Sequence, residues 1–418
     1  MTTTDTPSAV TDEELGALER AIRADEPAYL ADLERLVNTD CGSYTRDGVD
    51  RIGQFVAGFM AAHGATVELR PDPVGRLGST VIGTWRGGSK DVAGSEAAAG
   101  PRVLLIGHMD TVFDPGTAAE RPFAIKEGIA KGPGVTDMKS GLLAGLYAVK
   151  ALVASGPLPF ERLTYVANPD EEIGSPSSTP HIRESAAESD ACLVLECARA
   201  NGDIVSSRKG ILDAKVTIHG RAAHAGVEPE KGRSAILAAA DLVARLHALN
   251  GRWDGVTVNV GVIGGGTRPN VVAERCSLEV DVRAIRRSDL EAAEAEIRSL
   301  LDALAVPETT ADLEPMARWW PMEKLERSGR LVEHAQALAR RLGFEVRDAA
   351  TGGASDANTT SGMGVPSIDG LGPIGGMDHS PAEYLEVASV VPRTTLLAGL
   401  LLAIGRDPDV VAWRSSRR

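Results

Sequence analysis

The sequence predicts an α/β protein in which a smaller, ferredoxin-like α+β domain is inserted into a larger domain built on a helix-covered sheet. Three observations predict this fold class. The chain has 418 residues, which is too many for one ordinary hydrophobic core. Before residue 210, short apolar runs alternate with a helical segment, as they do in a βαβ unit. After residue 210, strands with one polar face follow, which is typical of a sheet that is covered on one side.

The part of the chain before residue 210 begins with helices and continues with short strands. Apolar residues recur at helical spacing from Leu15 to Phe59. Residues 86–100 are rich in Gly, Ser and Ala, which is typical of a surface loop. A leucine-rich segment at residues 142–152 predicts a further helix between the first two of three strands. These buried strands are predicted at the apolar runs 103–106, 163–167 and 192–195.

The middle of the chain alternates apolar and polar residues with the period of a half-buried strand. One helix is predicted at about 234–249, and Ser288–Glu291 reads as a capping box that opens a second helix. The order β-α-β-β-α-β is that of a ferredoxin-like unit, and it ends near Trp319–Pro321. The strands of this unit are expected at residues 212–218, 256–262 and 276–282, with a fourth before its end. The expected domains are a larger one from residues 1–210 and 321–418 and an inserted one from residues 211–320.

Composition and charge narrow the class of protein. The net charge is −14 and no Lys/Arg-rich block occurs, so we expect neither nucleic acid nor an anionic membrane as a partner. We also expect no apolar run of membrane-spanning length. The first residues lack the basic and apolar regions of a secretory signal, and four cysteines are few for this length. We therefore expect a cytoplasmic protein with four buried thiols at Cys41, Cys192, Cys197 and Cys276.

Residues with metal-binding chemistry follow the predicted strands. His108 ends the first strand, and Asp110 follows after one spacer residue. A metal-bound imidazole needs a hydrogen-bond acceptor that orients its ring, and Asp110 could supply it. Asp137 lies in a Gly-rich loop before the predicted helix, where it is either a helix N-cap or a ligand. Taken singly, these residues leave both interpretations open, because a histidine at a strand end often bonds only the backbone.

Further carboxylates and a second histidine occur later in the chain. Glu171 and Glu172 directly follow a strand, where adjacent carboxylates repel one another unless a cation or water screens them. A solvated acidic loop is the alternative. Glu196 ends the next apolar run, and His379 lies in a Gly-rich loop near the C-terminus. Because strands of an open α/β sheet place ligands at their C-terminal ends, we expect these side chains to converge.

Together these residues match the ligand inventory of a metal hydrolase. Two histidines with several carboxylates suit zinc, although cobalt and manganese can occupy similar ligand sets. Two metal ions about 3.5–4 Å apart need one bridging carboxylate and terminal ligands on each side. One carboxylate is left over, and a free glutamate beside the metals is what a hydrolase uses as a general base.

Six short motifs occur over nearly the whole chain, at Gly107–Asp110, Gly134–Lys139, Asp170–Gly174, Glu196, Gly220–Gly226 and His379–Pro381. In this order and spacing they resemble the co-catalytic zinc peptidase/aminoacylase family, which includes glutamate carboxypeptidase, aminoacylase, acetylornithine deacetylase and succinyl-diaminopimelate desuccinylase. The stretch Thr351–Asp356 places the resemblance nearest to glutamate carboxypeptidase. The resemblance implies a catalytic domain with a mixed sheet and helices on both faces. It also implies that the inserted domain is a dimerisation or lid domain.

The resemblance assigns roles to the candidate metal ligands. Asp137 would bridge two metal ions, and the peptide bond after it is expected to be cis. His108 and Glu196 would complete one metal site. Glu172 and His379 would complete the other.

The resemblance also implies catalytic roles for three further residues. Asp110 would orient His108, and Glu171 would act as the general base. His224 would reach across a homodimer to polarise the substrate carbonyl. From the residues alone, a histidine among small residues in a polar turn is more commonly an ordinary surface residue.

Recognition of a substrate carboxylate needs fixed cationic donors, and the planar fork of arginine matches a carboxylate best. Arg283 lies on the polar face of the strand at 276–282. Asn270 and Arg318 resemble substrate-binding positions of the family, although all three residues also read as ordinary surface groups. The basic residue that binds the substrate side chain in the folate-cleaving enzyme has no match here, so a preference for glutamate stays open.

The expected function is therefore hydrolysis of the amide bond of an N-acyl amino acid or small peptide with a free C-terminal carboxylate, by a homodimer with two zinc ions. A deacylase of N-acetyl or N-succinyl amino acids is the first alternative. A non-catalytic protein that binds amino-acid conjugates is the second.

Overall fold

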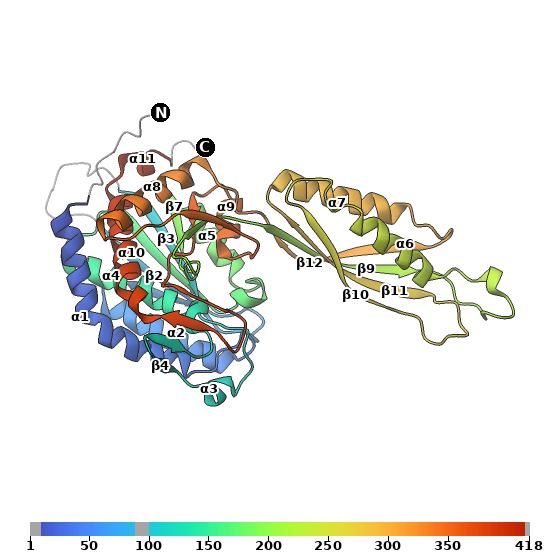
Figure 1. The fold of residues 1–418 in the computed structure, drawn as a ribbon, viewed down its shortest axis with the longest axis horizontal. Helices are drawn as coiled ribbons and strands as arrows, with labels where there is room; N and C mark the ends of the chain where they lie inside the picture. The colour runs from blue at the N-terminus through green and yellow to red at the C-terminus, as the bar shows by residue number, and fades with distance from the viewer. Residues whose placement is uncertain (1–9, 88–99, 414–418) are drawn as a thin grey trace. The chain divides into compact units, whose positions relative to one another are not determined.

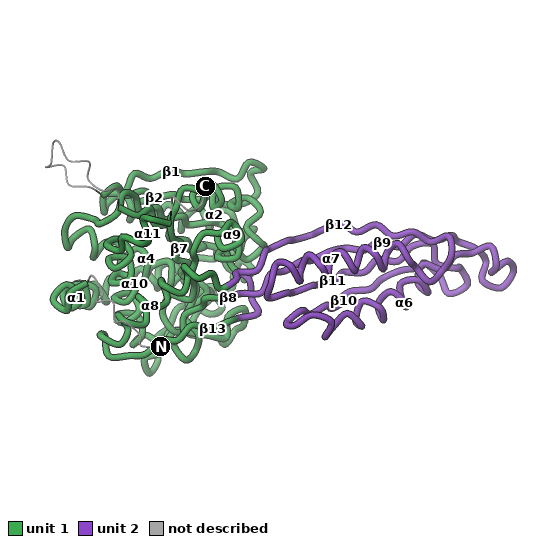
Figure 2. The backbone as a smooth tube through the Cα atoms, turned by 90° about the horizontal axis from the view of Figure 1, so that it is seen from above, with its two compact units in different colours: residues 1–206, 324–350, 355–418 green, residues 207–323, 351–354 purple. Residues whose placement is uncertain are grey.

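The computed structural model describes residues 10–87 and 100–413. The loop that we predict at residues 86–100 falls mainly outside these described residues. The chain forms two compact units, which are described separately (Figure 2). Unit 1 comprises residues 1–206, 324–350 and 355–418, and unit 2 comprises residues 207–323 and 351–354.

Unit 1 is built on a six-stranded mixed sheet with the order β1-β2-β6-β3-β7-β14. Strand β3 pairs in parallel with both β6 and β7, whereas β1 and β2 are antiparallel to their neighbours. The central strands are buried along nearly their whole length, which explains their continuous apolar runs. The strands of this sheet are β1 (Thr66–Arg70), β2 (Thr80–Arg86), β3 (Arg102–His108), β6 (Arg162–Asn168), β7 (Ala191–Val194) and β14 (Ser367–Ile368).

Helices flank the main sheet on both sides, in agreement with the predicted α/β fold (Figure 1). One layer contains α1, α4, α8 and α10, which contact one another, and α4 also contacts β3. On the other side, α5 and α9 contact each other, and α9 contacts β7 and β14. The helices of unit 1 are α1 (Asp12–Val37), α2 (Arg46–Ala62), α3 (Thr117–Glu120), α4 (Ser140–Ser155), α5 (Thr179–Ala187), α8 (Glu326–Arg341), α9 (Asp356–Gly362), α10 (Val390–Gly405) and α11 (Pro408–Ala412).

Helix α10 corrects one expectation from the sequence. The segment Val387–Gly405 is 19 residues long and apolar enough to cross a membrane, so the expectation that no run reaches this length is wrong. Its most apolar stretch is 83% buried within the protein. Arg393 also lies in this helix and donates hydrogen bonds to the carbonyl groups of Gly370 and Gly372. In this structure α10 is therefore a core helix of unit 1.

Unit 1 also contains a small four-stranded sheet, and a two-stranded sheet lies at its boundaries with unit 2. A four-stranded sheet has the order β15-β16-β5-β4 and consists of β15 (Gly375–Gly376), β16 (Tyr384–Glu386), β5 (Ile129–Lys131) and β4 (Ala124–Lys126). The loop between β15 and β16 carries His379. A second sheet pairs β8 (Ile204–Arg208) with β13 (Asp348–Thr351), and two of the four boundaries between the units fall within these strands.

Unit 2 has the predicted order β-α-β-β-α-β, with the strands arranged as β10-β11-β9-β12. All three neighbouring pairs are antiparallel. Residues of β9 alternate between buried and half-buried, because α6 and α7 cover one face of the sheet (Figure 1). The elements are β9 (Gly210–His219), α6 (Ala235–His247), β10 (Thr257–Gly265), β11 (Arg275–Ala284), α7 (Arg287–Asp302) and β12 (Thr310–Trp319).

The capping box predicted at Ser288–Glu291 is wrong. Helix α7 begins at Arg287, and its N-cap residue Arg286 makes no side-chain capping bond. Instead, the carboxylate of Glu323 accepts the backbone N–H of Arg287. Ser288 therefore lies inside the first turn, because a carboxylate from a distant part of the sequence replaces the local cap.

The division into units also differs from the predicted boundaries. The structure divides the chain at residues 206 and 323 rather than 210 and 320, and it assigns residues 351–354 to unit 2. Within unit 2, Lys209 N–H donates to the carbonyl of Thr351, and Arg283 donates to the carbonyl of Gly352. These hydrogen bonds join segments that are distant in sequence, so the local sequence pattern could not predict that residues 351–354 belong to unit 2.

Candidate metal centre

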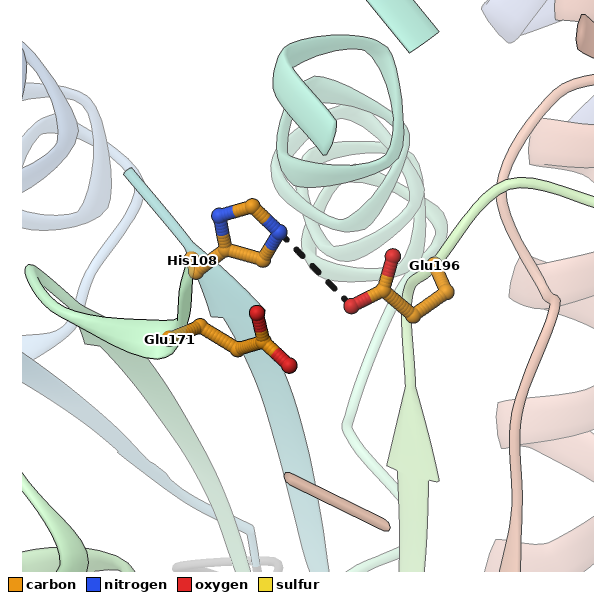
Figure 3. A group of neighbouring side chains, drawn as sticks. All are labelled: His108, Glu171 and Glu196. Atoms are coloured by element: carbon orange, nitrogen blue, oxygen red, sulfur yellow. Dashed lines mark ion pairs between the residues drawn. The ribbon is translucent and has the colours of Figure 1, made fainter. Parts of the chain in front are cut away.

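Three neighbouring strands of unit 1 end at the candidate metal centre. His108 is the last residue of β3, Glu171 follows β6, and Glu196 follows β7. The three strands are adjacent and parallel, so their C-terminal ends meet at one edge of the sheet. Figure 3 shows the side chains of these residues extending into a common space, with the His108 Nε2 atom 3.6 Å from Glu196 Oε1.

The His108 ring is oriented by Asp110. Its Nδ1 atom lies 3.1 Å from the backbone oxygen and 3.3 Å from the carboxylate Oδ1 of Asp110. The Asp110 carboxylate is fully buried and accepts hydrogen bonds from Ser43 Oγ at 2.6 Å and from the backbone N–H groups of Glu171 and Glu172. Asp110 thus holds both the imidazole and the turn that carries the two glutamates, which leaves His108 Nε2 pointing into the site.

Asp137 lies between the two histidines. Its Oδ1 atom is 3.1 Å from His108 Nε2, and its Oδ2 atom is 3.2 Å from His379 Nε2. The residue has non-helical backbone at a kink within the segment Val135–Lys139, and the Asp137–Met138 peptide bond is cis, as predicted. Asp137 is not a helix N-cap, because α4 begins at Ser140 with Lys139 as its N-cap. Each carboxylate oxygen of Asp137 faces a different imidazole, which is the arrangement of a bridging ligand.

The second imidazole also contacts Glu172. His379 Nε2 lies 3.1 Å from Glu172 Oε2, and His379 itself has a left-handed backbone with φ of 58°. Among the described residues, the other oxygen of Glu172 is buried and has no hydrogen-bond partner. A buried carboxylate oxygen without a donor is unfavourable in the protein alone, and a cation would satisfy it.

Without a metal ion, the charge of the cluster depends on the protons that its histidines and glutamates bind. Burial raises the pKa of Glu171 well above its usual value and also raises the pKa of Glu172. Hydrogen bonds to Asp137 and Glu172 raise the pKa of His379 to about 11. Burial opposes protonation of His108, but the hydrogen bonds to Asp110 and Asp137 outweigh it and raise the pKa. In this state protonated imidazoles supply the positive charge that the carboxylates require.

The same residues fit a metal centre. The possible metal ligands form two groups, and within each group the ligand atoms all lie within 4.8 Å of one another. One group consists of His108, Glu171 and Glu196, and the other of His108, Asp137 and Glu172. Their nitrogen and carboxylate donors suit zinc and related divalent ions. The fit rests on the unsatisfied Glu172 oxygen and on the position of Asp137 between two imidazoles. The structure thus brings together all five predicted ligands and Glu171.

Glu383 is a residue of this centre that the sequence analysis missed. Its carboxylate accepts the backbone N–H groups of Gly134, Thr136 and Asp137 at 2.8, 2.8 and 3.1 Å. Burial raises the pKa of Glu383 to about 7, although these three hydrogen bonds oppose the rise. Glu383 thereby fixes the loop that carries Asp137. Its position four residues after His379 was the only sequence signal.

A second missed residue, Asp356, supports the turn after β6. Its carboxylate accepts hydrogen bonds from Asn168 Nδ2 at 2.8 Å and from Ser175 Oγ at 2.6 Å. Burial raises the pKa of Asp356 to about 7. Asn168 and Ser175 lie on either side of Glu171 and Glu172 in the sequence, so Asp356 holds the ends of the segment that presents them.

The predicted residues of unit 2 fall into two groups. His224 and Asn270 are both exposed and lie on adjacent segments, where Ala225 N–H donates to the carbonyl of Asn270 at 3.0 Å. The Nδ1 atom of His224 accepts the backbone N–H of Gly226. This bond requires the Nε2–H tautomer when the ring is neutral, so Nε2 remains a donor.

Arg283 and Arg318 lie on opposite faces of the unit 2 sheet. Arg283 is opposite Ile211 on β9, whereas Arg318 is opposite Leu212, and successive residues of a strand face opposite sides. Arg318 forms an ion pair with Glu294 of α7, on the helix-covered face. Arg283 pairs with Asp281. The structure therefore does not bring these two predicted substrate ligands together.

Comparison with known proteins identifies a common family. A model described as "Peptidase family M20/M25/M40" matches residues 104–403. Carboxypeptidase G2 of Pseudomonas sp. (strain RS-16) is 31% identical over 396 residues, which cover 93% of this chain and 92% of that protein. Succinyl-diaminopimelate desuccinylase of Stenotrophomonas maltophilia (strain R551-3) is 30% identical over 310 residues, which cover 69% and 80%.

Solved structures show the same fold. The crystal structure of aminopeptidase PepT from Bacillus cereus ATCC 10987 superposes with a TM-score of 0.73 at 23% sequence identity. The match covers 91% of this chain and 99% of that chain. At this identity the likeness supports the fold alone, whereas the family match and the carboxypeptidase G2 alignment bear on the chemistry.

Proposed function

The chain belongs to peptidase family M20/M25/M40 and is a metal-dependent hydrolase, and from this premise we propose that it hydrolyses the amide bond of an N-acyl amino acid or small peptide with a free C-terminal carboxylate. The observation that carries the proposal is the position of Asp137, whose two oxygens face different histidines at 3.1 and 3.2 Å. Such a position supports a centre with two metal ions rather than one.

The proposed cofactor is a pair of zinc ions, with cobalt or manganese as alternatives. Asp137 would bridge the pair. His108 and Glu196 would complete one site, and Glu172 and His379 would complete the other. When bound, the metal ions would polarise the scissile carbonyl and make the attacking water more acidic.

Glu171 is the proposed general base. Its carboxylate would take a proton from the attacking water as the oxygen bonds to the carbonyl carbon, and would then pass the proton to the leaving nitrogen as the C–N bond breaks. Burial raises the pKa of Glu171, which favours a group that must accept and release a proton. Asp110 would act as a positioning residue for His108.

The carbonyl and carboxylate of the substrate would be recognised by unit 2. His224 offers its Nε2 as a donor to the oxyanion, and Asn270 lies on the neighbouring segment. Arg283 is the proposed partner of the carboxylate, since it lies on the face of the sheet that no helix of unit 2 covers. Arg318 is a weaker candidate because it lies on the face of the sheet that α7 covers, where it pairs with Glu294.

The proposal is tested by metal analysis and by reversible metal removal. Two equivalents of metal per chain are expected after purification in zinc, and chelation should abolish hydrolysis of a panel of N-acyl amino acids that includes aryl-acyl glutamates. Readdition of zinc should restore the rate. A protein that keeps its full rate after verified metal removal would contradict the proposal.

A deacylase of N-acetyl or N-succinyl amino acids is the second candidate. The observation that favours it is the 30% identity with a succinyl-diaminopimelate desuccinylase. The same panel distinguishes the two, because a deacylase would prefer acetyl or succinyl groups over aryl-acyl groups. The third expectation, a non-catalytic binding protein, is wrong, because the family match and the carboxypeptidase relative place the chain among metal-dependent hydrolases.

We further propose that the enzyme is a homodimer formed through unit 2. Strand β10 is at the edge of its sheet, and its residues Val262 and Ile263 are 52% and 55% exposed. Ile236 and Leu237 on α6 are also exposed. An exposed apolar edge strand commonly pairs with another chain, and a second copy of β10 would cover it.

The dimer is tested by light scattering coupled to size-exclusion chromatography. A molar mass of about twice 43.8 kDa is expected for the wild type. The substitution Ile263→Lys should shift the protein toward the monomer, since a charge at the edge disfavours pairing. A wild type that stays monomeric at micromolar concentration would contradict the proposal.

A further inference from the structure

A pocket of about 400 Å³ opens beside the metal centre on unit 1. Glu172, a proposed metal ligand, is one of its lining residues. The remaining wall comes from two segments, residues 42–45 after α1 and residues 111–115 after β3, together with Ile173. A substrate whose scissile carbonyl lies at the metal ions would therefore have this pocket next to one of its two ends.

The two segments are fixed to each other by backbone hydrogen bonds. Thr111 N–H donates to the carbonyl of Cys41 at 3.0 Å, and Ser43 N–H donates to the carbonyl of Thr111 at 3.3 Å. A side chain at Gly42 would collide with the carbonyl oxygen of Phe113, at 2.4 Å from the added Cβ. Ser43 Oγ also donates to Asp110 at 2.6 Å. The pocket is thus preformed and tied to the residue that orients His108.

Apolar side chains form a large part of the pocket lining, beside the hydroxyl groups of Ser43, Thr45 and Thr111. Tyr44 is 72% exposed and Val112 is 41% exposed, although large apolar side chains are usually covered in a folded protein. Phe113, Pro115 and Ile173 add further apolar surface. Exposed apolar side chains gathered at a preformed pocket favour a ligand with apolar surface of its own.

The charges of the pocket decide which end of the substrate it takes. Apart from the proposed metal ligand Glu172, the lining includes the carboxylate of Asp114 but, as far as the structure describes it, no lysine or arginine. Arg121 stacks over the ring of Phe113 at 4.6 Å from the centroid, but it is not a lining residue. A free carboxylate needs cationic donors and would be repelled here. The carboxylate end of the substrate therefore lies elsewhere, and the acyl end is left for this pocket.

We propose that the pocket beside Glu172 receives the acyl group of the substrate and selects an uncharged, apolar acyl group, aliphatic or aromatic, over an anionic one such as succinyl. This inference rests on the proposed function, since it names the acyl class of that reaction. Tyr44 and Val112 are the specificity-determining residues, and neither contacts the candidate metal ligands in any described bond or ion pair.

The test compares kcat/KM for the N-benzoyl, N-acetyl and N-succinyl derivatives of L-glutamate and of L-alanine, with the zinc-loaded full chain. The wild type should prefer benzoyl over succinyl. Tyr44→Ala should lower the benzoyl-to-acetyl ratio about tenfold by removing apolar contact. Val112→Arg should raise the succinyl-to-benzoyl ratio about tenfold by adding a carboxylate donor.

The matched controls are Leu69→Ala and Leu69→Arg, because Leu69 is an exposed apolar residue that does not line the pocket. Neither control should change any ratio by more than about twofold. Each result is the ratio of the kcat/KM values for two substrates, measured on one preparation. Partial unfolding of a variant lowers both values equally and therefore does not change the ratio.

Failure of this inference can be told apart from failure of the proposed function. If the wild type hydrolyses these compounds but prefers succinyl, or if both pocket variants keep the wild-type ratios, the pocket assignment is overturned while the proposed function stands. If the zinc-loaded enzyme hydrolyses neither these compounds nor small peptides with a free C-terminal carboxylate, both are overturned.

Discussion

In unit 1 the predicted functional side chains other than the exposed His379 are buried or half-buried and are held by hydrogen bonds, whereas in unit 2 His224 and Asn270 are exposed. Asp110 alone accepts three hydrogen bonds from groups around the metal centre. His224 accepts one, from Gly226 two residues away. Buried carboxylates need a cation and fixed donors to remain ionised, but an exposed imidazole is already solvated. Changes at the metal ligands of unit 1 and at the residues that hold them should therefore alter metal binding, and a change at His224 should alter turnover without altering metal content.

The largest effect is expected for Glu171→Gln. Loss of the general base should lower kcat about 10³-fold, because a positioned base typically contributes about 10²–10⁴-fold. Since Glu171 is not one of the five proposed ligands, the variant should still bind two metal ions per chain. Steady-state kinetics and metal analysis on the same sample check both points. Unchanged turnover would remove Glu171 from the mechanism.

The matching substitution in unit 2 is His224→Ala. It should lower kcat about 10²-fold, as expected for loss of one oxyanion donor, and leave metal content and thermal stability unchanged. His219 serves as a control, because it is also a histidine of unit 2 but pairs with Asp312 on the strand β12. His219→Ala should change kcat less than about twofold. Equal losses in both variants would mean that the effect is structural.

A smaller effect on catalysis is expected for Asp110→Asn. The substitution keeps the shape but removes a charged acceptor, so metal affinity should fall about 10–100-fold, as is typical when a partner of a metal-ligating histidine is changed. Competition with a zinc chelator measures this loss. Excess zinc should restore most of the rate, which would not happen if Asp110 acted directly on substrate.

Glu383→Gln tests the loop that carries Asp137. Loss of one carboxylate oxygen should leave at least one of the three N–H groups of this loop weakly bonded, so we expect about tenfold weaker metal binding. Glu386, three residues later at the end of β16, provides the control as Glu386→Gln. If the Glu383→Gln variant kept the metal affinity of the wild type, Glu383 would contribute only to the stability of the fold and not to metal binding.

The smallest effect is expected for Arg318→Ala in unit 2. Burial opposes ionisation of Glu294, but hydrogen bonds from Arg298 and Arg318 outweigh it and lower the pKa of Glu294 below its usual 4.5. The unfolded chain then binds more protons, so this stabilisation is present above about pH 4.5 and is lost as the pH falls through the folded pKa.

Removal of Arg318 should therefore cost about 0.2–1 kcal/mol of unfolding free energy at neutral pH, and less in acid. Chemical denaturation at pH 7 and pH 3.5 measures the difference. KM should stay within about twofold of the wild type. A rise in KM of tenfold or more would restore Arg318 as a substrate ligand.

The metal centre illustrates what could be predicted. His108, Glu171 and Glu196 each follow a buried strand, and because parallel strands end at the same edge, the sequence pattern alone predicted that they converge. Asp137 and His379 were placed by motif resemblance, since neither follows a strand of the main sheet. No role was predicted for Glu383, or for Asp356 at the end of the stretch Thr351–Asp356, because their partners are backbone N–H groups and neutral side chains that only the fold brings near.

The sequence by itself determined the order of the elements, the α/β class and the family, because hydrophobic period and motif spacing are local properties of a chain. Only the tertiary structure decided that Glu383 holds the loop of Asp137, that Glu323 caps α7 and that Arg318 faces α7 rather than the open side of its sheet. The physical reason is that each of these contacts joins residues at least 24 positions apart, where the folded backbone, rather than local propensity, brings the charges together.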